Sequence, residues 1–328
     1  MIRYLVLASA AVLASNSAAP GFDLQGHRGG RGLFPENTLV AFEGALGIGV
    51  STFELDTAVT RDGVVIVSHD SQANPDITRT AEGKWLEKPG PAFFTMDYAD
   101  VARYDVGRIR PATAYALRFR QQQGRDAVRI PRLSDLFAMV AAKGDSTVRF
   151  NIETKLDPRF PEQTPAPEAF AAAVVRVIRD ASMTERSTIQ SFDWRTLKVV
   201  QRIAPEIATV CLTTQQGDDD NIRVSQPGPS TWTAGLDVDD FGGSVPRLVK
   251  AAGCAVWSPN ALDVTPERIV EAQRLGLRVI PWTVNEPPDM ERLIRANVDG
   301  LISDRPDLLR GVLTQLGRAV PPPVRAKP

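Results

Sequence analysis

From residue 23 onward the chain alternates short β-rich runs with amphipathic helical runs. The β-rich runs begin near residues 24, 53, 149, 188, 208, 255, 279 and 300, and stretches with helical periodicity follow most of them. About eight strand–helix units is the number that closes a parallel barrel. An open doubly wound sheet is the alternative, but HRGGRG has neither of the glycine spacings that usually accompany that architecture. The pattern therefore predicts an α/β fold, a TIM barrel.

Capping residues and glycines set the expected limits of these elements. Helices are expected over 38–49, 132–144, 167–183, 194–204, 245–253, 265–276, 288–297 and 305–317. The first strand is expected over 23–29, and the turn at Pro35 to Thr38 supplies good capping residues for the first helix. Asp62-Gly63, between two apolar runs, predicts a β-hairpin after the second strand.

Three segments interrupt the repeating pattern. Residues 71–130 contain scattered prolines and aromatics without a clean strand, and we interpret them as a small insertion with short helices after the second strand. Residues 1–19 combine Arg3, a short apolar run and small residues, which is typical of a signal peptide. The proline-rich residues 319–328 predict a disordered tail, which leaves 20–318 for the barrel. We therefore expect an exported protein, either periplasmic or secreted.

Composition excludes some classes of partner. Lys and Arg number 38 against 39 Asp and Glu, so net charge does not favour nucleic acid or an anionic membrane. The N-terminal apolar run is too short to span a bilayer, so no stable membrane insertion is expected. The oligomeric state is left open. Cys211 and Cys254 lie in apolar runs and are expected to be buried hydrophobic residues; export would permit a disulfide, but nothing in the sequence pairs them.

Candidate site residues concentrate at the ends of predicted strands, where barrel enzymes place their active sites. His27 and His69, the only two histidines, flank a strand in which Glu54 and Asp56 share one face because side chains alternate. Glu153 and Lys155 end a later strand. The three carboxylates offer hard oxygen ligands that suit Ca²⁺ or Mg²⁺. The alternative is that Arg28 and Lys155 neutralise them by salt bridges.

Phosphodiester chemistry is consistent with the remaining charges. Imidazoles such as His27 and His69 can exchange protons near neutral pH, one with the attacking and one with the leaving oxygen. Arg28 can contact two phosphate oxygens and Lys155 can supply a point charge.

The motifs also occur together in one known family. HRG, PENT, FELD, DGVVIVSHD, NIETK, QSFDW, PWTVN and DGLISDRP, in this order, resemble the glycerophosphodiester phosphodiesterase family over nearly the whole chain. The resemblance implies a TIM barrel that hydrolyses glycerophosphodiesters to an alcohol and sn-glycerol 3-phosphate with one divalent cation, Ca²⁺ or Mg²⁺. It implies a catalytic pair (His27, His69), metal ligands (Glu54, Asp56, Glu153) and phosphate contacts (Arg28, Lys155).

Other assignments stay open at this point. Trp282 is a candidate wall of the glycerol pocket and equally a core aromatic, and Gln190, Phe192 and Asn285 are further candidates. A barrel phospholipase of the phosphoinositide or sphingomyelin type and a non-catalytic exported phosphodiester-binding protein are alternative functions. A metal-dependent sugar isomerase or aldolase is a weaker one, because fold does not determine function.

Overall fold

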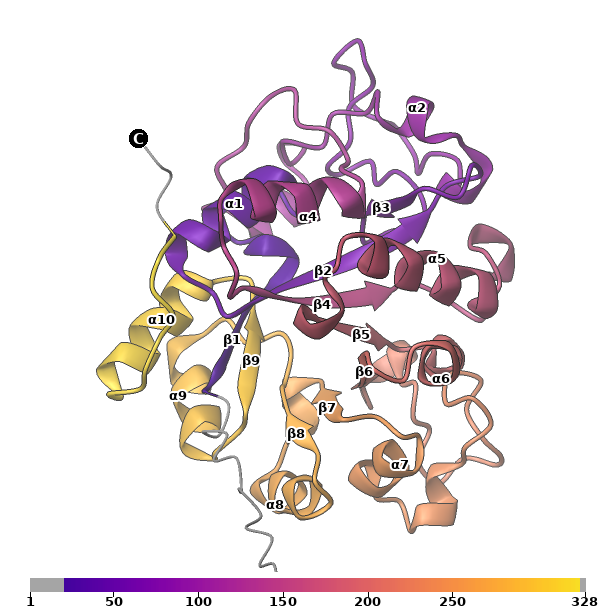
Figure 1. Ribbon diagram of the computed structural model, residues 1–328, viewed down its shortest axis with the longest axis vertical. Coiled ribbons are helices and arrows are strands. Elements are labelled where there is room, and N and C mark those ends of the chain that lie inside the picture. The colour runs from indigo at the N-terminus through magenta and orange to yellow at the C-terminus, as the bar shows by residue number, and fades with distance from the viewer. Residues whose placement is uncertain (1–20, 325–328) are drawn as a thin grey trace, which may run out of the picture.

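Within residues 21–324, the part of the chain that this computed structural model describes, eight parallel strands form a nearly closed barrel in the order β8-β7-β6-β5-β4-β2-β1-β9 (Figure 1). They are β1 (Asp23–Gly26), β2 (Thr52–Val59), β4 (Arg149–Thr154), β5 (Ser187–Ser191), β6 (Ala208–Thr213), β7 (Val256–Pro259), β8 (Arg278–Val279) and β9 (Gly300–Ser303). Hydrogen bonds from Asp299 N to Val279 O (2.9 Å) and from Ile302 N to Pro281 O (3.0 Å) bridge β8 and β9. The predicted TIM-barrel architecture is confirmed.

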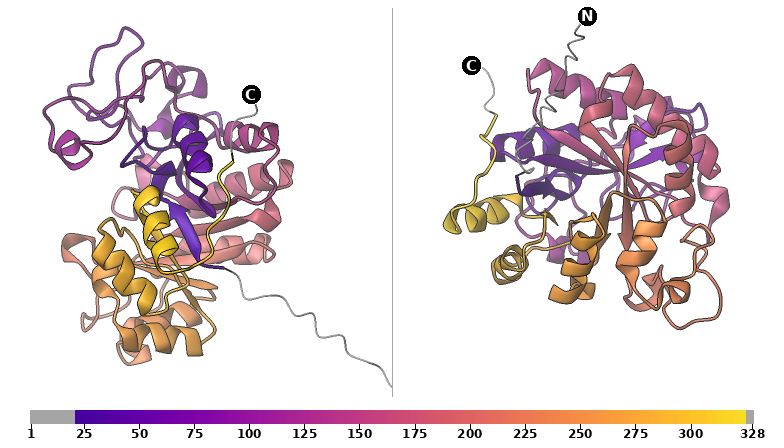
Figure 2. Two further views of the ribbon diagram at one scale, coloured as in Figure 1. Left: turned by 90° about the vertical axis from the view of Figure 1, so that its left-hand side faces the viewer. Right: turned by 60° about the horizontal axis from the view of Figure 1, so that its bottom comes forward.

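Helices surround the strands (Figure 2). The main ones are α1 (Leu39–Ile48), α4 (Leu133–Ala142), α5 (Pro167–Asp180), α6 (Trp194–Ile203), α7 (Val245–Ala251), α8 (Pro266–Arg274), α9 (Pro287–Arg295) and α10 (Pro306–Gln315). Short 3-10 helices are η1 (His27–Gly29), η2 (Phe93–Thr95), η3 (Pro161–Gln163), η4 (Thr184–Arg186), η5 (Gly217–Asp219), η6 (Val238–Phe241) and η7 (Ala261–Asp263). The main helices agree with the expected ranges to within a few residues.

Side-chain caps explain where several helices begin. The hydroxyls of Thr38, Ser244 and Thr265 each accept a hydrogen bond from the backbone N–H three residues later. Gly49 ends α1 with a φ of 86°, a conformation that glycine adopts without steric cost. Each helix then packs its apolar face against the outside of the barrel, where the large core lies.

The barrel interior is partly polar, and its polar side chains position one residue of the site. Asn151 Nδ2 donates to Gln25 Oε1 (3.1 Å) and to Gln190 Oε1 (2.7 Å) across the barrel. Gln190 Nε2 in turn donates to Glu54 Oε1 (2.7 Å). All four side chains are buried, so this chain of amides holds the Glu54 carboxylate in one orientation.

The predicted hairpin is present: β3 (Val65–Val67) pairs antiparallel with β2. Residues 71–130 follow it and lie above β3 in Figure 1. Within them are η2, α2 (Tyr98–Val101) and α3 (Ala114–Arg118), together with isolated bridges. A small separate core that includes Ile66, Phe93 and Ile130 anchors this segment to the outside of the β2–β3 hairpin.

Three expectations about the chain outside the barrel have different outcomes. Residues 319–324, the described part of the predicted tail, lie beside α1 and α10, where Val324 N donates to Leu46 O (2.9 Å) and Arg310 Nη1 donates to Pro321 O (2.6 Å). Residues 325–328 and the predicted signal peptide, 1–19, lie outside the described residues. No helix within 21–324 is both long and apolar enough to cross a membrane.

Cys211 and Cys254 form a disulfide, with Cα atoms 5.9 Å apart. Both are buried, as expected, and the structure decides the pairing that the sequence left open. They pair because Cys211 lies in β6 and Cys254 just before β7, and these strands are neighbours in the barrel. Their proximity depends on strand order, which the separation of 43 residues does not reveal.

Replacing both cysteines, Cys211→Ala with Cys254→Ala, should lower the free energy of unfolding. Chain entropy for a crosslink spanning 43 residues gives about 4 kcal/mol. Urea unfolding of the wild type and the double variant, each with and without reductant, measures the difference. The urea midpoint of reduced wild type should approach that of the variant, and the variant's midpoint should not change with reductant. If full reduction leaves the wild-type midpoint unchanged, the prediction is contradicted.

Candidate active site

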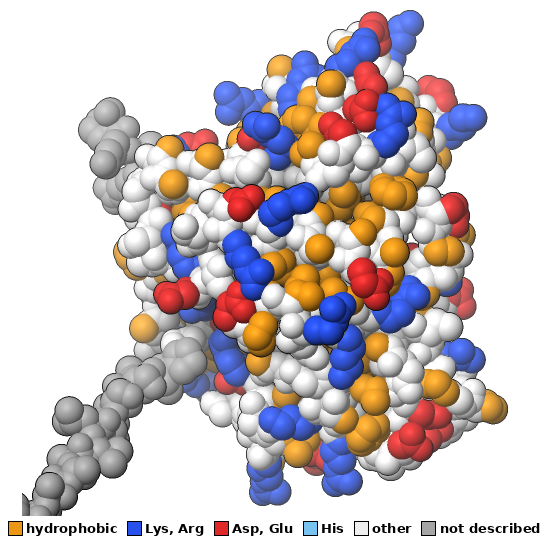
Figure 3. Space-filling model, turned by 45° about the vertical axis from the view of Figure 1, so that its right-hand side comes forward, with side chains coloured by type: hydrophobic (Ala, Val, Ile, Leu, Met, Phe, Trp, Pro, Cys, Tyr) orange, Lys and Arg blue, Asp and Glu red, His pale blue; other side chains and the backbone are white. Residues whose placement is uncertain are grey.

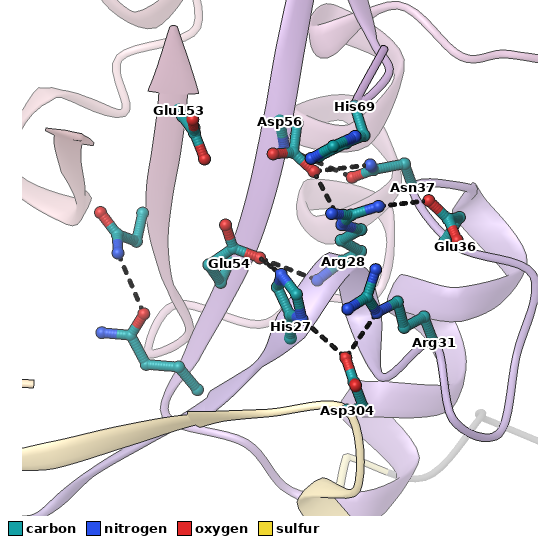
Figure 4. Close-up of polar contacts among 12 residues, drawn as sticks. His27, Arg28, Arg31, Glu36, Asn37, Glu54, Asp56, His69, Glu153 and Asp304 are labelled. Carbon is teal, nitrogen blue, oxygen red and sulfur yellow. Dashed lines mark hydrogen bonds and ion pairs between the residues drawn. The ribbon is translucent and has the colours of Figure 1, made fainter. Parts of the chain in front are cut away.

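The carboxyl ends of the strands gather the predicted site residues around a cavity of about 410 Å³. The cavity is lined by all the residues predicted for catalysis, metal and substrate: His27, Arg28, Glu54, Asp56, His69, Glu153, Lys155 and Trp282. Figure 4 shows side chains from η1, β2 and β4 converging on this region. Residues separated by up to 255 positions in sequence therefore share one site, as expected for a barrel mouth.

Local structure explains how the two histidines arrive there. The chain leaves β1 through η1, in which Arg28 has a φ of 52°, so that His27 and Arg28 turn over the end of the barrel. His69 follows the hairpin strand β3, and Ser68 N donates to Asp56 O (3.0 Å). This backbone bond brings the His69 segment alongside the end of β2.

The three predicted metal ligands form a buried acidic cluster. Glu54, Asp56 and Glu153 each offer a carboxylate oxygen, and these oxygens lie within 4.8 Å of one another. The register of the parallel strands β2 and β4 pairs Asp56 with Glu153, while Glu54 precedes Asp56 by two residues on the same face. The side-chain spacing expected from the sequence is therefore present.

Basic side chains compensate only part of this charge. Lys155 Nζ lies 3.0 Å from Glu153 Oε1, and Arg28 Nε lies 3.2 Å from Asp56 Oδ2. The salt bridges considered as an alternative to a metal thus exist. Among residues 21–324, however, no Lys or Arg is within ion-pair distance of Glu54, whose oxygens accept from Arg28 N and Gln190 Nε2.

The pKa values reflect this imbalance. Burial raises the pKa of Glu54 well above its usual range, and the Asp56 and Glu153 charges add to the rise. Burial also raises the pKa of Glu153 to about 7, against the opposing effect of Lys155. Burial would raise the pKa of Asp56 as well, but nearby cations, Arg28 foremost, hold it well below its usual range. A hard divalent cation fits this all-oxygen cluster because it would stabilise all three ionised carboxylates.

A carboxylate orients His27. Its Nδ1 lies 2.6 Å from Asp304 Oδ1, and Asp304 also accepts from Arg31 Nε (2.6 Å) and Asn285 Nδ2 (2.8 Å). His27 Nε2 is on the other side of the ring, 3.8 Å from Glu54 Oε2. Burial, together with Arg31, lowers the pKa of His27 to about 4, although Asp304 opposes the shift. Neutral His27 therefore carries its proton on Nδ1 and presents Nε2 to the cavity.

His69 is held in a similar way. Its Nδ1 lies 2.7 Å from Asp70 Oδ1, and Asp70 also accepts from Asn74 Nδ2 (2.8 Å). His69 Nε2 lies 3.1 Å from Lys155 Nζ. Burial, followed by Arg28 and Lys155, lowers the pKa of His69. Both imidazoles thus have Nδ1 fixed by a carboxylate and Nε2 directed to the centre of the site.

Several residues that hold Arg28 and Asp56 in place were not predicted from the sequence. Arg28 Nη1 pairs with Glu36 Oε1 (2.6 Å), and Glu36 Oε2 accepts a hydrogen bond from the Tyr115 hydroxyl. Asn37 Nδ2 donates to Asp56 Oδ2 (2.9 Å). Glu36 and Asn37 were interpreted as capping residues, but only Thr38 caps α1, and the other two side chains turn into the site (Figure 4).

Asp304 and Tyr115 were both missed, but only Asp304 could have been found from the sequence. Asp304, which orients His27, follows β9 and could have been selected as a polar residue at a strand end. Tyr115 had no such signal, because it belongs to α3 in the segment 71–130 and reaches Glu36 only through the folding of that segment.

Trp282 lies in the barrel core and also lines the cavity, and its role in binding glycerol stays a prediction. Its ring packs against a small apolar cluster inside the barrel (Val210, Val256, Ile280, Ile302), and its Nε1 donates to Ser258 O (3.0 Å). The exposed part of the ring lines the cavity beside Phe192, with ring centroids 5.3 Å apart. Trp282 therefore belongs to the barrel core and to the wall of the site.

The sequence profile of the glycerophosphoryl diester phosphodiesterase family matches residues 27–308, a range that includes all the site residues described above. The chain belongs to this family. Members of the family hydrolyse glycerophosphodiesters, and the chain is accordingly an enzyme of the phosphodiesterase class.

Individual relatives agree with this assignment. A glycerophosphodiester phosphodiesterase of Caldanaerobacter subterraneus is 28% identical over 295 residues, which cover 89% of this chain and 97% of the relative. A solved structure from Silicibacter pomeroyi, assigned to the glycerophosphoryl diester phosphodiesterases, is 35% identical with a TM-score of 0.81, covering 92% of this chain and 96% of that one. A phosphodiesterase of Oleispira antarctica, solved with the product sn-glycerol-3-phosphate, is 19% identical with a TM-score of 0.65, covering 90% and 97%.

The acidic cluster generates a prediction about cation binding. Adding Ca²⁺ or Mg²⁺ to metal-stripped protein should stabilise the folded state by about 2.7 kcal/mol at about 100 times the dissociation constant. Glu54→Gln should lose most of this stabilisation, because it removes the one carboxylate of the cluster that no Lys or Arg within residues 21–324 neutralises. Calorimetric unfolding with and without cation measures both effects.

Glu185→Gln is the matched control, since Glu185 is an exposed residue of η4. It should retain the full cation-dependent rise in Tm. An equal rise in Glu54→Gln would show that the cation binds elsewhere.

Proposed function

We propose that this protein hydrolyses glycerophosphodiesters to an alcohol and sn-glycerol 3-phosphate, with a divalent cation and with His27 and His69 as the proton-transferring groups. One observation carries the proposal: two imidazoles with carboxylate-anchored Nδ1 atoms line the same cavity as the acidic cluster, Arg28 and Lys155. A bound glycerol 3-phosphate in the distant relative from Oleispira antarctica supports the assignment of the product.

Arg28 and Lys155 would bind the phosphate. Arg28 is buried and held from two sides by Glu36 and Asp56, so its guanidinium is already positioned before substrate binds. Lys155 Nζ lies between Glu153 and His69 and can reach a phosphate oxygen beside either group. Glu54, Asp56 and Glu153 would hold Ca²⁺ or Mg²⁺, which when bound would withdraw charge from the non-bridging oxygens.

The walls of the cavity suggest how the two histidines divide the proton transfers. His69 also lines a second, larger cavity next to the site, whereas His27 lines only the smaller one. We assign His69 to protonation of the departing alcohol, which needs the larger space. The negative charge of a bound phosphodiester would favour the imidazolium form of His69, whose Nε2 proton would pass to the alcohol oxygen as the phosphorus–oxygen bond breaks. His27 would deprotonate the nucleophile, either water or the glycerol 2-hydroxyl with a cyclic phosphate intermediate.

Export remains part of the proposal. Residues 1–19 have the composition of a signal peptide, and the disulfide between Cys211 and Cys254 supports an oxidising compartment such as the periplasm or the exterior.

Replacing either histidine tests the mechanism. His27→Ala and His69→Ala should each lower kcat for glycerophosphocholine by about 10²- to 10⁴-fold, because each removes a proton-transferring group. Release of glycerol 3-phosphate from metal-loaded protein measures the loss. The cation-dependent rise in Tm should persist in both variants, which shows that the fold and the metal site are intact.

The same assay separates the alternative functions. Hydrolysis of intact phospholipid vesicles without hydrolysis of glycerophosphocholine would favour the phospholipase. Ligand binding without turnover in the wild type, unchanged in His27→Ala, would favour a phosphodiester-binding protein.

Tyr115 generates a separate prediction. Tyr115→Phe leaves the buried Glu36 carboxylate without one hydrogen bond and should loosen Arg28, lowering kcat/KM by about tenfold (about 1.4 kcal/mol). Tyr98→Phe is the matched control, because Tyr98 lies in the same segment and donates to Ile130 O (3.3 Å) away from the site. Equal effects of the two substitutions on kcat/KM would indicate a general loss of stability.

A further inference from the structure

A second cavity of about 650 Å³ adjoins the active site. His69, Lys155 and Trp282 line both cavities, so a molecule bound across the catalytic groups would extend from one into the other. Figure 3 brings forward the side toward which β2 and β4 point in Figure 1, and hydrophobic side chains gather in its middle between charges of both signs. In the proposed function this second cavity only provides space for the departing alcohol, and the chemistry of its wall plays no part.

Aromatic rings form much of its wall. Phe160, Phe192, Trp232 and Trp282 come from four separate loops and all line the cavity. Trp232 is held in place through its backbone, since its carbonyl accepts a hydrogen bond from Trp194 N (2.8 Å). Phe160 and Trp232 lie on the part of the wall that the catalytic cavity does not share.

The structure already places one organic cation against these rings. The Arg159 guanidinium lies 5.4 Å from the ring centroid of Trp232 and 6.0 Å from that of Phe160. Asp157 pairs with it through Nε (2.9 Å) and Nη2 (2.7 Å). Because Asp157 neutralises Arg159, this half-exposed guanidinium adds little net positive charge to the cavity.

Negative charge predominates among the other ionisable groups of this wall. Asp70 and Asp219 line the cavity, and Lys155 is paired with Glu153. Asp219 is an exposed residue of η5 whose charge acts on Arg159, but that guanidinium is already paired with Asp157. Aromatic faces combined with surplus carboxylates attract ammonium groups and disfavour anions.

We propose that this second cavity is the subsite for the departing alcohol and that it favours an alcohol bearing a protonated amine or a quaternary ammonium group. The inference rests on the proposed function, in which His69 protonates that alcohol. Trp232 and Asp219 are the specificity-determining residues. Arg159 occupies part of the aromatic surface and competes with the ammonium group for it.

Two glycerophosphodiesters test this specificity. Glycerophosphocholine carries a quaternary ammonium group, and glycerophosphoglycerol carries a neutral head group on the same phosphodiester. The wild type should have the higher kcat/KM for glycerophosphocholine. Trp232→Leu should lower the choline-to-glycerol ratio of kcat/KM by about tenfold through KM, and Asp219→Asn by about threefold.

Matched controls lie nearby in the chain. Trp85→Leu removes a tryptophan that also contacts an arginine but does not line the cavity, and Asp218→Asn changes a neighbouring carboxylate outside the wall. Both should leave the ratio unchanged. Arg159→Gln should raise the ratio, because it removes the guanidinium that competes for the aromatic surface. A lowered ratio would overturn the inference.

Binding of tetramethylammonium, followed by tryptophan fluorescence, tests the subsite independently of turnover. Wild type should bind it more tightly than Trp232→Leu, and tert-butanol, a neutral molecule of similar shape, should bind neither. Tetramethylammonium binding without hydrolysis of either diester would refute the proposed function but support a cation subsite. Hydrolysis of both diesters with equal kcat/KM, and no tetramethylammonium binding, would overturn the inference alone.

Discussion

Repulsion among three buried carboxylates is the constraint on which this site depends. Glu54, Asp56 and Glu153 come from two adjacent strands whose register is determined by backbone hydrogen bonds, so the side chains cannot separate without disrupting the barrel. The fold supplies Lys155 and Arg28 beside two of them and only neutral donors beside Glu54. The remaining charge would favour a bound cation, and the stability of the barrel holds the three carboxylates together without one.

The residues around the acidic cluster and the histidines mainly orient these side chains and contribute less to balancing their charge. Asp304 and Asp70 each hold an imidazole by Nδ1, so that both Nε2 atoms face the same space. The amide chain through the barrel interior fixes Glu54, and Glu36 fixes Arg28. Through Tyr115 these orienting contacts extend into the segment 71–130, which thereby contributes to the active site as well as covering the β2–β3 hairpin.

Much of the fold and of the site could be predicted because local patterns encode them. Strand and helix positions follow from periodicity and caps, and the shared face of Glu54 and Asp56 follows from strand geometry. Asp304 was missed although it stands at a strand end. The Cys211–Cys254 disulfide and the contacts of residues 319–324 could not be predicted from the sequence, because both depend on which elements become neighbours in space.

The sequence by itself determined the repeating strand–helix order, the residue types of the site and their placement late in strands, because these depend on interactions among residues near in the chain. Only the tertiary structure decided which residues meet. The closed barrel brings His27 to Asp304, sets Tyr115 against Glu36, and places Arg159 over Trp232 in the wall of the cavity that His69 also lines. Such contacts arise from packing between distant segments, and no local pattern specifies which distant partner a side chain will find.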